Sequence, residues 1–200
     1  MIAHARRAVP SSLLVVAAVL VVVLLVLVEY RPYTLWPLQG MAVGLLAAAA
    51  AWCFDEPAAA ITDTTPRHLA WQTTARSTGV VALLLVWVVT VAQTRSGYFG
   101  HALDVAWQGI AATLAVTAIV TWRRSRHVAT PGRSVFAATV TVSLFMAVVK
   151  PLAEYVEVFP YTSSGDWGGA RTLWTAAAVL AVAVLWAALG GLSSSRVPRR

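Results

Sequence analysis

Three charged residues in the second half of the chain have types and spacing that could support chemistry. Glu154 and Glu157 are three residues apart, and Lys150 lies one turn before Glu154, so on a helix they would share a face. Ionisable groups at membrane depth are costly unless paired or functional, so the glutamates could relay protons or hold a cation. Thr139 and Ser143 align approximately with Lys150 on one helix face, and the five residues together form a candidate polar path or gate. The alternative is a Lys150–Glu154 ion pair with Glu157 in solvent.

Other site chemistries are not supported by the sequence. The histidines His4, His68, His101 and His127 fall in separate loops, a pattern that favours neither a haem nor a zinc site. Cys53 is the only cysteine, so an internal disulfide and a CxxC redox pair are excluded, and ordinary apolar packing is expected for it.

The sequence does not favour either of two enzyme classes. Ser164 and His101 could both lie at the outer surface, which permits a Ser/His hydrolase, but no nucleophile-elbow motif or third orienting group accompanies them. The chain has no G-x-x-x-x-G-K-[ST] motif and its only lysine is Lys150, so ATP hydrolysis by this chain is not expected. We therefore expect no enzyme activity and no catalytic, cofactor-binding or metal-binding residue.

The residues that could do chemistry must be positioned by long apolar segments. Of 200 residues, 59% are hydrophobic and 12% are charged, which leaves no room for a separate soluble domain. A bilayer core about 30 Å thick needs about 20 helical residues. The fold expected is all-α, a single transmembrane domain over residues 1–200 with six helices. The predicted spans are roughly Ser12 to Val28, Pro37 to Phe54, Thr78 to Gln93, Val105 to Trp122, Val135 to Val149 and Leu173 to Leu192.

The basic residues fall unevenly on the two sides of these spans. If the N-terminus faces the cytoplasm, eleven arginines lie on the inner side and four basic residues on the outer side, which by the positive-inside rule places both termini in the cytoplasm. The inner residues are Arg6, Arg7, Arg67, Arg76, Arg123, Arg124, Arg126, Arg133, Arg196, Arg199 and Arg200, and the outer ones are Arg31, Arg95, Lys150 and Arg171.

This charge pattern also indicates the location and the partners. We expect a multi-pass protein of the bacterial cytoplasmic (inner) membrane in contact with membrane lipid. The net charge of +7 flanks apolar spans instead of forming a basic face with aromatic residues, so nucleic acid is not an expected partner. Fourteen arginines to one lysine, with abundant Ala and Val, hint at a GC-rich bacterial gene. The run after Arg7 lacks a small-x-small cleavage site and is interpreted as a retained first helix.

Two connections are predicted to have structure of their own. Pro66 follows Thr65 as a helix start, and a short cytoplasmic helix from Pro66 to Arg76 would present Leu69 and Trp71 along the membrane surface. The alternative is a solvated turn. The outer segment from Lys150 to Arg171 is too apolar for a free loop and too charged for a lipid-facing span, which predicts a short, partly re-entrant helix.

Taken together, this layout resembles the membrane (permease) subunit of a bacterial ABC-type exporter of the type-two export class. The matching features are internal termini, six spans, the element between spans two and three and the re-entrant outer segment. The Asp55-Glu56-Pro57-Ala58 and Thr65-Pro66-Arg67 sequences also resemble this loop in small actinobacterial export permeases.

The resemblance implies a role for the inner element and a set of partners. That element would be a coupling helix that contacts a separate cytoplasmic ATPase, which would bind the ATP and Mg²⁺. A second copy of the permease or a paralogue would complete the transporter. The coupling residues would be Pro66, Arg67, His68, Leu69, Trp71 and Arg76, and reversing the charges of Arg67 and Arg76 should uncouple the ATPase. The alternative function is a non-transporting membrane scaffold or accessory subunit of a larger complex.

Overall fold

The computed structural model describes residues 11–55, 69–126, 128, 130–152 and 154–190. Its described residues form helices and connecting turns with no strand, which confirms the predicted all-α class. The elements are α2 (Ser11–Tyr30), α3 (Pro32–Leu35), α4 (Pro37–Trp52), α6 (Leu69–Gln93), η1 (Arg95–Tyr98), α7 (Ala102–Ser125), α8 (Pro131–Val148) and α9 (Trp167–Gly190).

Five of the helices are long and apolar enough to cross a membrane. They are α2, α6, α7, α8 and α9, and each contains or overlaps a predicted span. The remaining long element, α4, has 16 residues, fewer than the roughly 20 that a hydrocarbon core requires. The structure therefore confirms five helices of the length and apolar composition that the predicted spans require.

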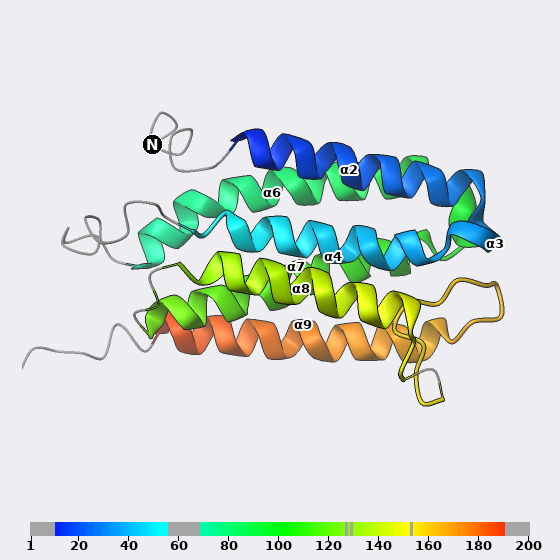
Figure 1. The fold of residues 1–200 in the computed structure, drawn as a ribbon. Helices are drawn as coiled ribbons and strands as arrows, with labels where there is room; N and C mark the ends of the chain where they lie inside the picture. The colour runs from blue at the N-terminus through cyan, green and yellow to red at the C-terminus, as the bar shows by residue number, and fades with distance from the viewer. Residues whose placement is uncertain (1–10, 56–68, 127, 129, 153, 191–200) are drawn as a thin grey trace, which may run out of the picture.

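The short helix α4 lies in the middle of the bundle. Figure 1 shows it running alongside α2 and α8, and α7 packs between α4 and α9. Eleven of the 16 residues of α4 are buried. Because most of these are alanine or glycine, neighbouring backbones can approach from several sides at once.

Glycines set the closest approach between α4 and its neighbour α8. A Cβ atom added at Gly40 would lie 2.8 Å from Cβ of Ala147, and one added at Gly44 would overlap Ser143. These two small residues, four apart in sequence, thus form a packing stripe between α4 and α8. On the other side of the core, Gly109 of α7 leaves room for the buried ring of Trp87 from α6.

The outer surface of the bundle is apolar along its length. Large hydrophobic side chains are exposed on α2, α6, α8 and α9, among them Val15, Leu85, Val142 and Leu180. An exposed apolar surface of this extent would be unfavourable in water, since soluble monomers rarely expose contiguous patches above a few hundred Å². The helices are therefore suited to a lipid environment.

The two ends of the bundle differ in charge. We call the end where α4, α7 and α9 finish the Asp55 end, and the opposite one the Asp104 end (Figure 1). Among the described residues, five arginines and one carboxylate lie toward the Asp55 end, against four basic and five acidic residues toward the Asp104 end. The residues of the Asp55 end are Arg76, Arg123, Arg124, Arg126, Arg133 and Asp55, and those of the Asp104 end are Arg31, Arg95, Lys150, Arg171, Glu29, Asp104, Glu154, Glu157 and Asp166.

Two predicted loop helices differ in the structure. The segment from Leu69 to Arg76 is the first part of the 25-residue helix α6, not a separate helix along the membrane surface, because no proline divides it from the apolar run and a single glycine, Gly79, is tolerated within a helix. Pro66, Arg67 and His68 lie outside the described residues. Between α8 and α9 the described residues form turns and bends up to Trp167, so the prediction of a re-entrant helix there is wrong.

Candidate functional site

The most concentrated polar chemistry within the bundle is an ion pair at the Asp104 end. Asp104 lies in the first turn of α7 with its side chain 8% exposed, and Arg171 lies in the first part of α9. The guanidinium of Arg171 donates two hydrogen bonds to the carboxylate, Nε to Oδ1 at 2.7 Å and Nη2 to Oδ2 at 3.1 Å. This two-pronged geometry is the strong form of a charge-assisted hydrogen bond.

A histidine also contacts the carboxylate of this ion pair. Nδ1 of His101 lies 3.1 Å from Oδ2 of Asp104, and the imidazole stacks on the indole of Trp167 with ring centroids 4.3 Å apart. The same indole donates to the backbone oxygen of Thr162 at 2.8 Å. The cluster therefore joins the starts of α7 and α9 to the long connection that precedes α9.

Deeper in the bundle, α7 carries polar groups that face the core. Gln39 Nε2 on α4 donates to Gln108 Oε1 at 3.1 Å, and both side chains are buried. Within the described residues, Gln108 Nε2 and the hydroxyls of Thr113, Thr117 and Thr121 have no hydrogen-bond partner. Unpaired polar groups of this kind are uncommon in protein interiors, and the threonines follow one another at four-residue spacing along α7.

Lys150 contacts two aromatic rings instead of a carboxylate. Its Nζ lies 3.8 Å from the ring centroid of Trp36 and 3.6 Å from that of Tyr161, and the two rings stack with centroids 4.3 Å apart. Its backbone has a positive φ of 51°, which turns the chain at the end of α8. Cation–π contacts of this type fix the following connection against the start of α4.

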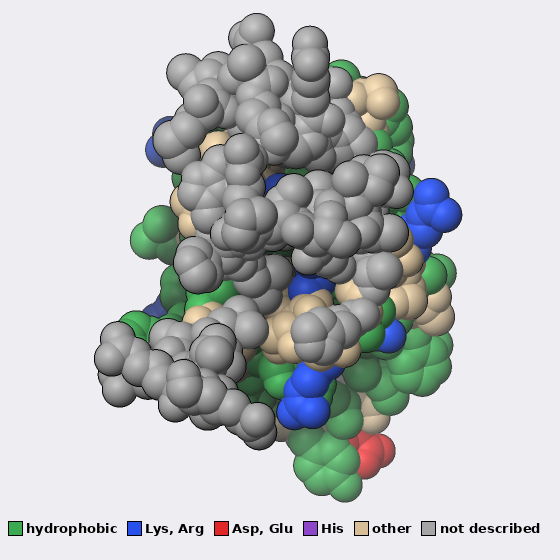
Figure 2. Space-filling model, turned by 90° about the vertical axis from the view of Figure 1, so that its left-hand side faces the viewer, with side chains coloured by type: hydrophobic (Ala, Val, Ile, Leu, Met, Phe, Trp, Pro, Cys, Tyr) green, Lys and Arg blue, Asp and Glu red, His purple; other side chains and the backbone are tan. Residues whose placement is uncertain are grey.

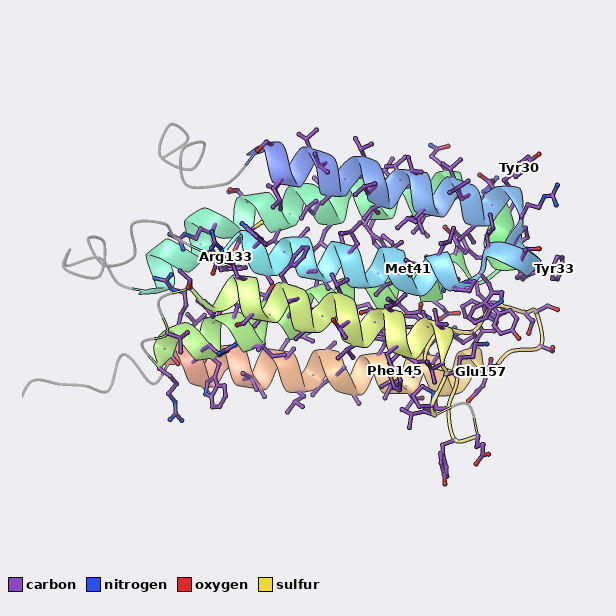
Figure 3. The ribbon with its side chains drawn as sticks, in the orientation of Figure 1. Tyr30, Tyr33, Met41, Arg133, Phe145 and Glu157 are labelled. Carbon is purple, nitrogen blue, oxygen red and sulfur yellow. The ribbon has the colours of Figure 1, made fainter. Side chains whose placement is uncertain are left out.

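The predicted polar path does not assemble as one line of side chains. Ser143 packs against Gly44 in the α4–α8 interface, and Thr139 is half-buried. Glu154 is exposed, whereas Glu157 accepts a hydrogen bond from the backbone N–H of Asp166 at 3.2 Å. Figure 3 shows Glu157 on the connection beside the end of α8. The glutamates do not share a helix face, because the segment that carries them is not helical.

A second polar centre joins α4 to α8 at the Asp55 end. The buried carboxylate of Asp55 accepts hydrogen bonds from the backbone N–H groups of Gly132 at 2.6 Å and Arg133 at 2.9 Å. These amides lie in the first turn of α8, where N–H groups have no partner within the helix. Asp55 therefore caps a helix 77 residues away in sequence, and its negative charge lies at the positive end of the α8 dipole.

Arginines complete this joint from two other helices. Nη1 of Arg76, on α6, donates to the backbone oxygen of Phe54 at 2.8 Å, and Nη1 of Arg124, on α7, approaches the same oxygen at 3.4 Å. The side chain of Arg76 is buried, with 5% exposure, because the carbonyl groups at the end of α4 draw it inward. Arg76 therefore contacts the bundle and is not displayed for a soluble partner.

The remaining predicted coupling residues are only partly located. Pro66, Arg67 and His68 are outside the described residues, and for Leu69 and Trp71 the structure describes the helical backbone alone. The proposed charge reversal of Arg67 with Arg76 would also disturb the Arg76–Phe54 contact, so it does not isolate an effect on a partner.

Sequence reasoning missed both polar centres. Asp104 and Arg171 are 67 residues apart. The only signal in the sequence was an acidic residue near the start of one apolar helix and a basic residue near the start of another.

Among the described residues, no three His, Cys, Asp or Glu side chains lie close enough to hold a metal ion. Within the described residues, the carboxylates of Asp104 and Asp55 are thus engaged in joining helices.

Comparisons with known proteins give no relative for this chain. No family model matches it, and no curated protein and no solved structure matches it.

Proposed function

We propose that this chain is a multi-pass subunit of a larger assembly in the bacterial cytoplasmic membrane, with its Asp55 end in the cytoplasm. The excess of arginine at the Asp55 end and the slight excess of carboxylates at the Asp104 end support this orientation, since cytoplasmic loops are rich in Lys and Arg. Both termini would then be cytoplasmic.

Six crossings fit this placement. The helix α4 runs parallel to the bundle axis beside α2 and α8 (Figure 1). Its 16 residues extend about 24 Å at 1.5 Å per residue, and Cys53 and Phe54 continue the buried apolar segment. Because its flanks are covered by protein, α4 does not need the full length of a lipid-exposed span.

The best-supported role is that of a non-transporting scaffold or accessory subunit. The observation that carries this proposal is the close packing of α4. Its glycines contact α8 directly, and Asp55, which follows α4, caps the start of α8. A core of close-packed Ala and Gly strongly resists rearrangement, because separating the helices would unpack many contacts at once. Such a bundle is suited to holding other membrane components in place.

The exporter permease is the second candidate. The observation that favours it is that α4 ends and α6 begins at the arginine-rich Asp55 end, where a cytoplasmic ATPase carrying ATP and Mg²⁺ would bind. Transport would then occur between two copies of the chain, or between the chain and a paralogue, since the core of one copy is close-packed. Partners would include membrane lipid and no nucleic acid.

Affinity purification from native membranes, followed by mass spectrometry, separates these two functions. The exporter proposal predicts a co-purifying ATPase with a P-loop motif, whose recovery falls in an Arg67→Glu variant and is unchanged in the matched Arg31→Glu variant at the other end. The scaffold proposal predicts co-purifying membrane proteins without such an ATPase. Recovery of the chain alone after mild cross-linking would contradict both.

A further inference from the structure

An exposed arginine surface at the Asp55 end lies where α7 finishes and α8 begins. Arg126 at the end of α7 and Arg133 at the start of α8 are both exposed, and the two helix ends are joined where Nη1 of Arg123 donates to Ser134 Oγ at 2.8 Å. We name this set, Arg123, Arg126, Arg133 and Ser134, the α7–α8 arginine surface. Figure 2 shows basic side chains distributed over this end of the molecule, and Figure 3 marks Arg133 there.

The charge of this surface is not neutralised by described acidic residues. The one described carboxylate toward this end is Asp55, and its two oxygens accept the N–H groups of Gly132 and Arg133. The side chain of Arg126 lies over the ring of Trp122, and that of Arg133 over the ring of Trp52. Aromatic rings leave the charge of a guanidinium intact, so both arginines can bind an anion.

The arginine surface continues directly into lipid-facing apolar surface. Ile119 (47% exposed), Trp122 (45% exposed) and Arg126 follow one another at spacings of three and four on α7, so they form one exposed stripe. Along this stripe the order is aliphatic, aromatic and cationic. A phospholipid has the same order from acyl chain through glycerol ester to phosphate, and tryptophan is typical of the ester level.

We propose that the α7–α8 arginine surface binds the head group of an anionic phospholipid, with an acyl chain lying along Trp122 and Ile119. The inference rests on the membrane placement in the proposed function and is independent of whether the chain transports anything. Charge alone would fit an acidic protein equally well. The exposed apolar stripe that leads away from the arginines favours a lipid, because an acyl chain would cover this stripe, whereas an acidic soluble protein would bind the arginines alone.

Native mass spectrometry of the purified full chain tests this proposal. The protein is exchanged into vesicles of phosphatidylcholine with or without phosphatidylglycerol, extracted in mild detergent, and the retained lipids are counted. The variant is Arg126→Ala with Arg133→Ala, which leaves the Arg123–Ser134 bond in place. The matched control is Arg31→Ala with Arg95→Ala, which removes two exposed arginines at the other end.

The expected result is selective retention of phosphatidylglycerol by the unmodified chain and by the control. At about 1 kcal/mol for each arginine near an anionic surface, the double variant should bind it about 30-fold more weakly. Equal retention by variant and control would overturn the proposal. So would displacement of the lipid by millimolar inorganic phosphate at constant ionic strength, because the site would then recognise phosphate without the lipid.

A second measurement does not depend on folding of the double variant. Brominated phosphatidylglycerol quenches nearby tryptophan, and it should quench the unmodified chain more than brominated phosphatidylcholine does at the same mole fraction. The difference should shrink in a Trp122→Phe variant. An identical response to the two lipids would overturn the inference, whereas flotation of the chain with the vesicles reports membrane insertion separately and tests the proposed function.

Discussion

Replacing Asp55 with alanine should loosen the joint between α4 and α8 more than any ordinary loss of a helix cap. In the structure the carboxylate accepts two backbone N–H groups, those of Gly132 and Arg133, and is itself buried. A lost N-cap costs about 0.5–2 kcal/mol, and a buried N–H left without an acceptor costs about 1–3 kcal/mol. Since the Gly132 amide is the more enclosed, we expect Asp55→Ala to lower the free energy of unfolding by about 2–4 kcal/mol.

Two further variants test the same joint. Asp55→Asn keeps one carbonyl acceptor and loses the charge at the start of α8, so its effect should be smaller than that of Asp55→Ala. A Cβ added at Gly132 would lie 2.6 Å from both the oxygen of Ala51 and Oδ1 of Asp55, so Gly132→Ala should cost about 1–3 kcal/mol. The double variant should cost less than the sum, because one of the two clashes involves Asp55 itself.

The assay is equilibrium unfolding in mixed detergent micelles with increasing dodecyl sulfate, followed by tryptophan fluorescence. Asp166→Ala is the matched control, because Asp166 caps α9 through the N–H of Gly169 at 2.8 Å in an exposed setting. We expect about 1 kcal/mol or less for it. If Asp55→Ala were no more destabilising than Asp166→Ala, the described role of Asp55 would be refuted.

Three other predictions use the same unfolding assay. Arg171→Ala should destabilise the bundle more than Asp104→Ala, because Asp104 is buried and would be left charged, whereas Arg171 is 64% exposed and would stay hydrated; equal losses would contradict this account. Burial raises the pKa of Tyr98 to about 12 from 10.0, so its stabilising contribution is complete below pH 10 and is lost between pH 10 and 12. A Tyr98→Phe variant should lack this alkaline loss, and parallel pH curves for the two proteins would contradict the assignment. Gly44→Val should destabilise the α4–α8 contact by about 1–3 kcal/mol, whereas Gly168→Ala, which meets one atom at 3.8 Å, should have little effect, and similar losses for both would show that Gly44 is not a packing site.

The helices could be predicted from the sequence because their signal is local. Apolar runs such as Ser12 to Val28 and Leu173 to Leu192 satisfy the length and hydropathy that lipid requires, and the structure has the helices Ser11–Tyr30 and Trp167–Gly190 in these regions. The packing role of Gly40 and Gly44 can also be predicted from the sequence, since four-residue spacing of small residues is itself a local pattern.

The polar contacts could not be predicted because they join distant segments. Lys150 and Glu154 are at helical spacing, yet the structure pairs Lys150 with two rings, from Trp36 and Tyr161. The predicted ion pair required the helix to continue beyond Lys150. In the structure, the helix ends there, because Lys150 has a positive φ and Pro151 follows it. Similarly, Arg76 was interpreted as a surface charge, although the end of α4 binds it in the interior.

Accessibility labelling in intact cells tests the central claim most directly, which is that the bundle crosses the membrane with its Asp55 end in the cytoplasm. In a Cys53→Ala background, single Ser96→Cys and Thr130→Cys variants place a thiol at exposed positions of the Asp104 end and the Asp55 end. A membrane-impermeant maleimide should label the Ser96→Cys variant in intact cells and the Thr130→Cys variant only after the membrane is permeabilised. Labelling of the Thr130→Cys variant in intact cells, or of both variants equally, would contradict the account.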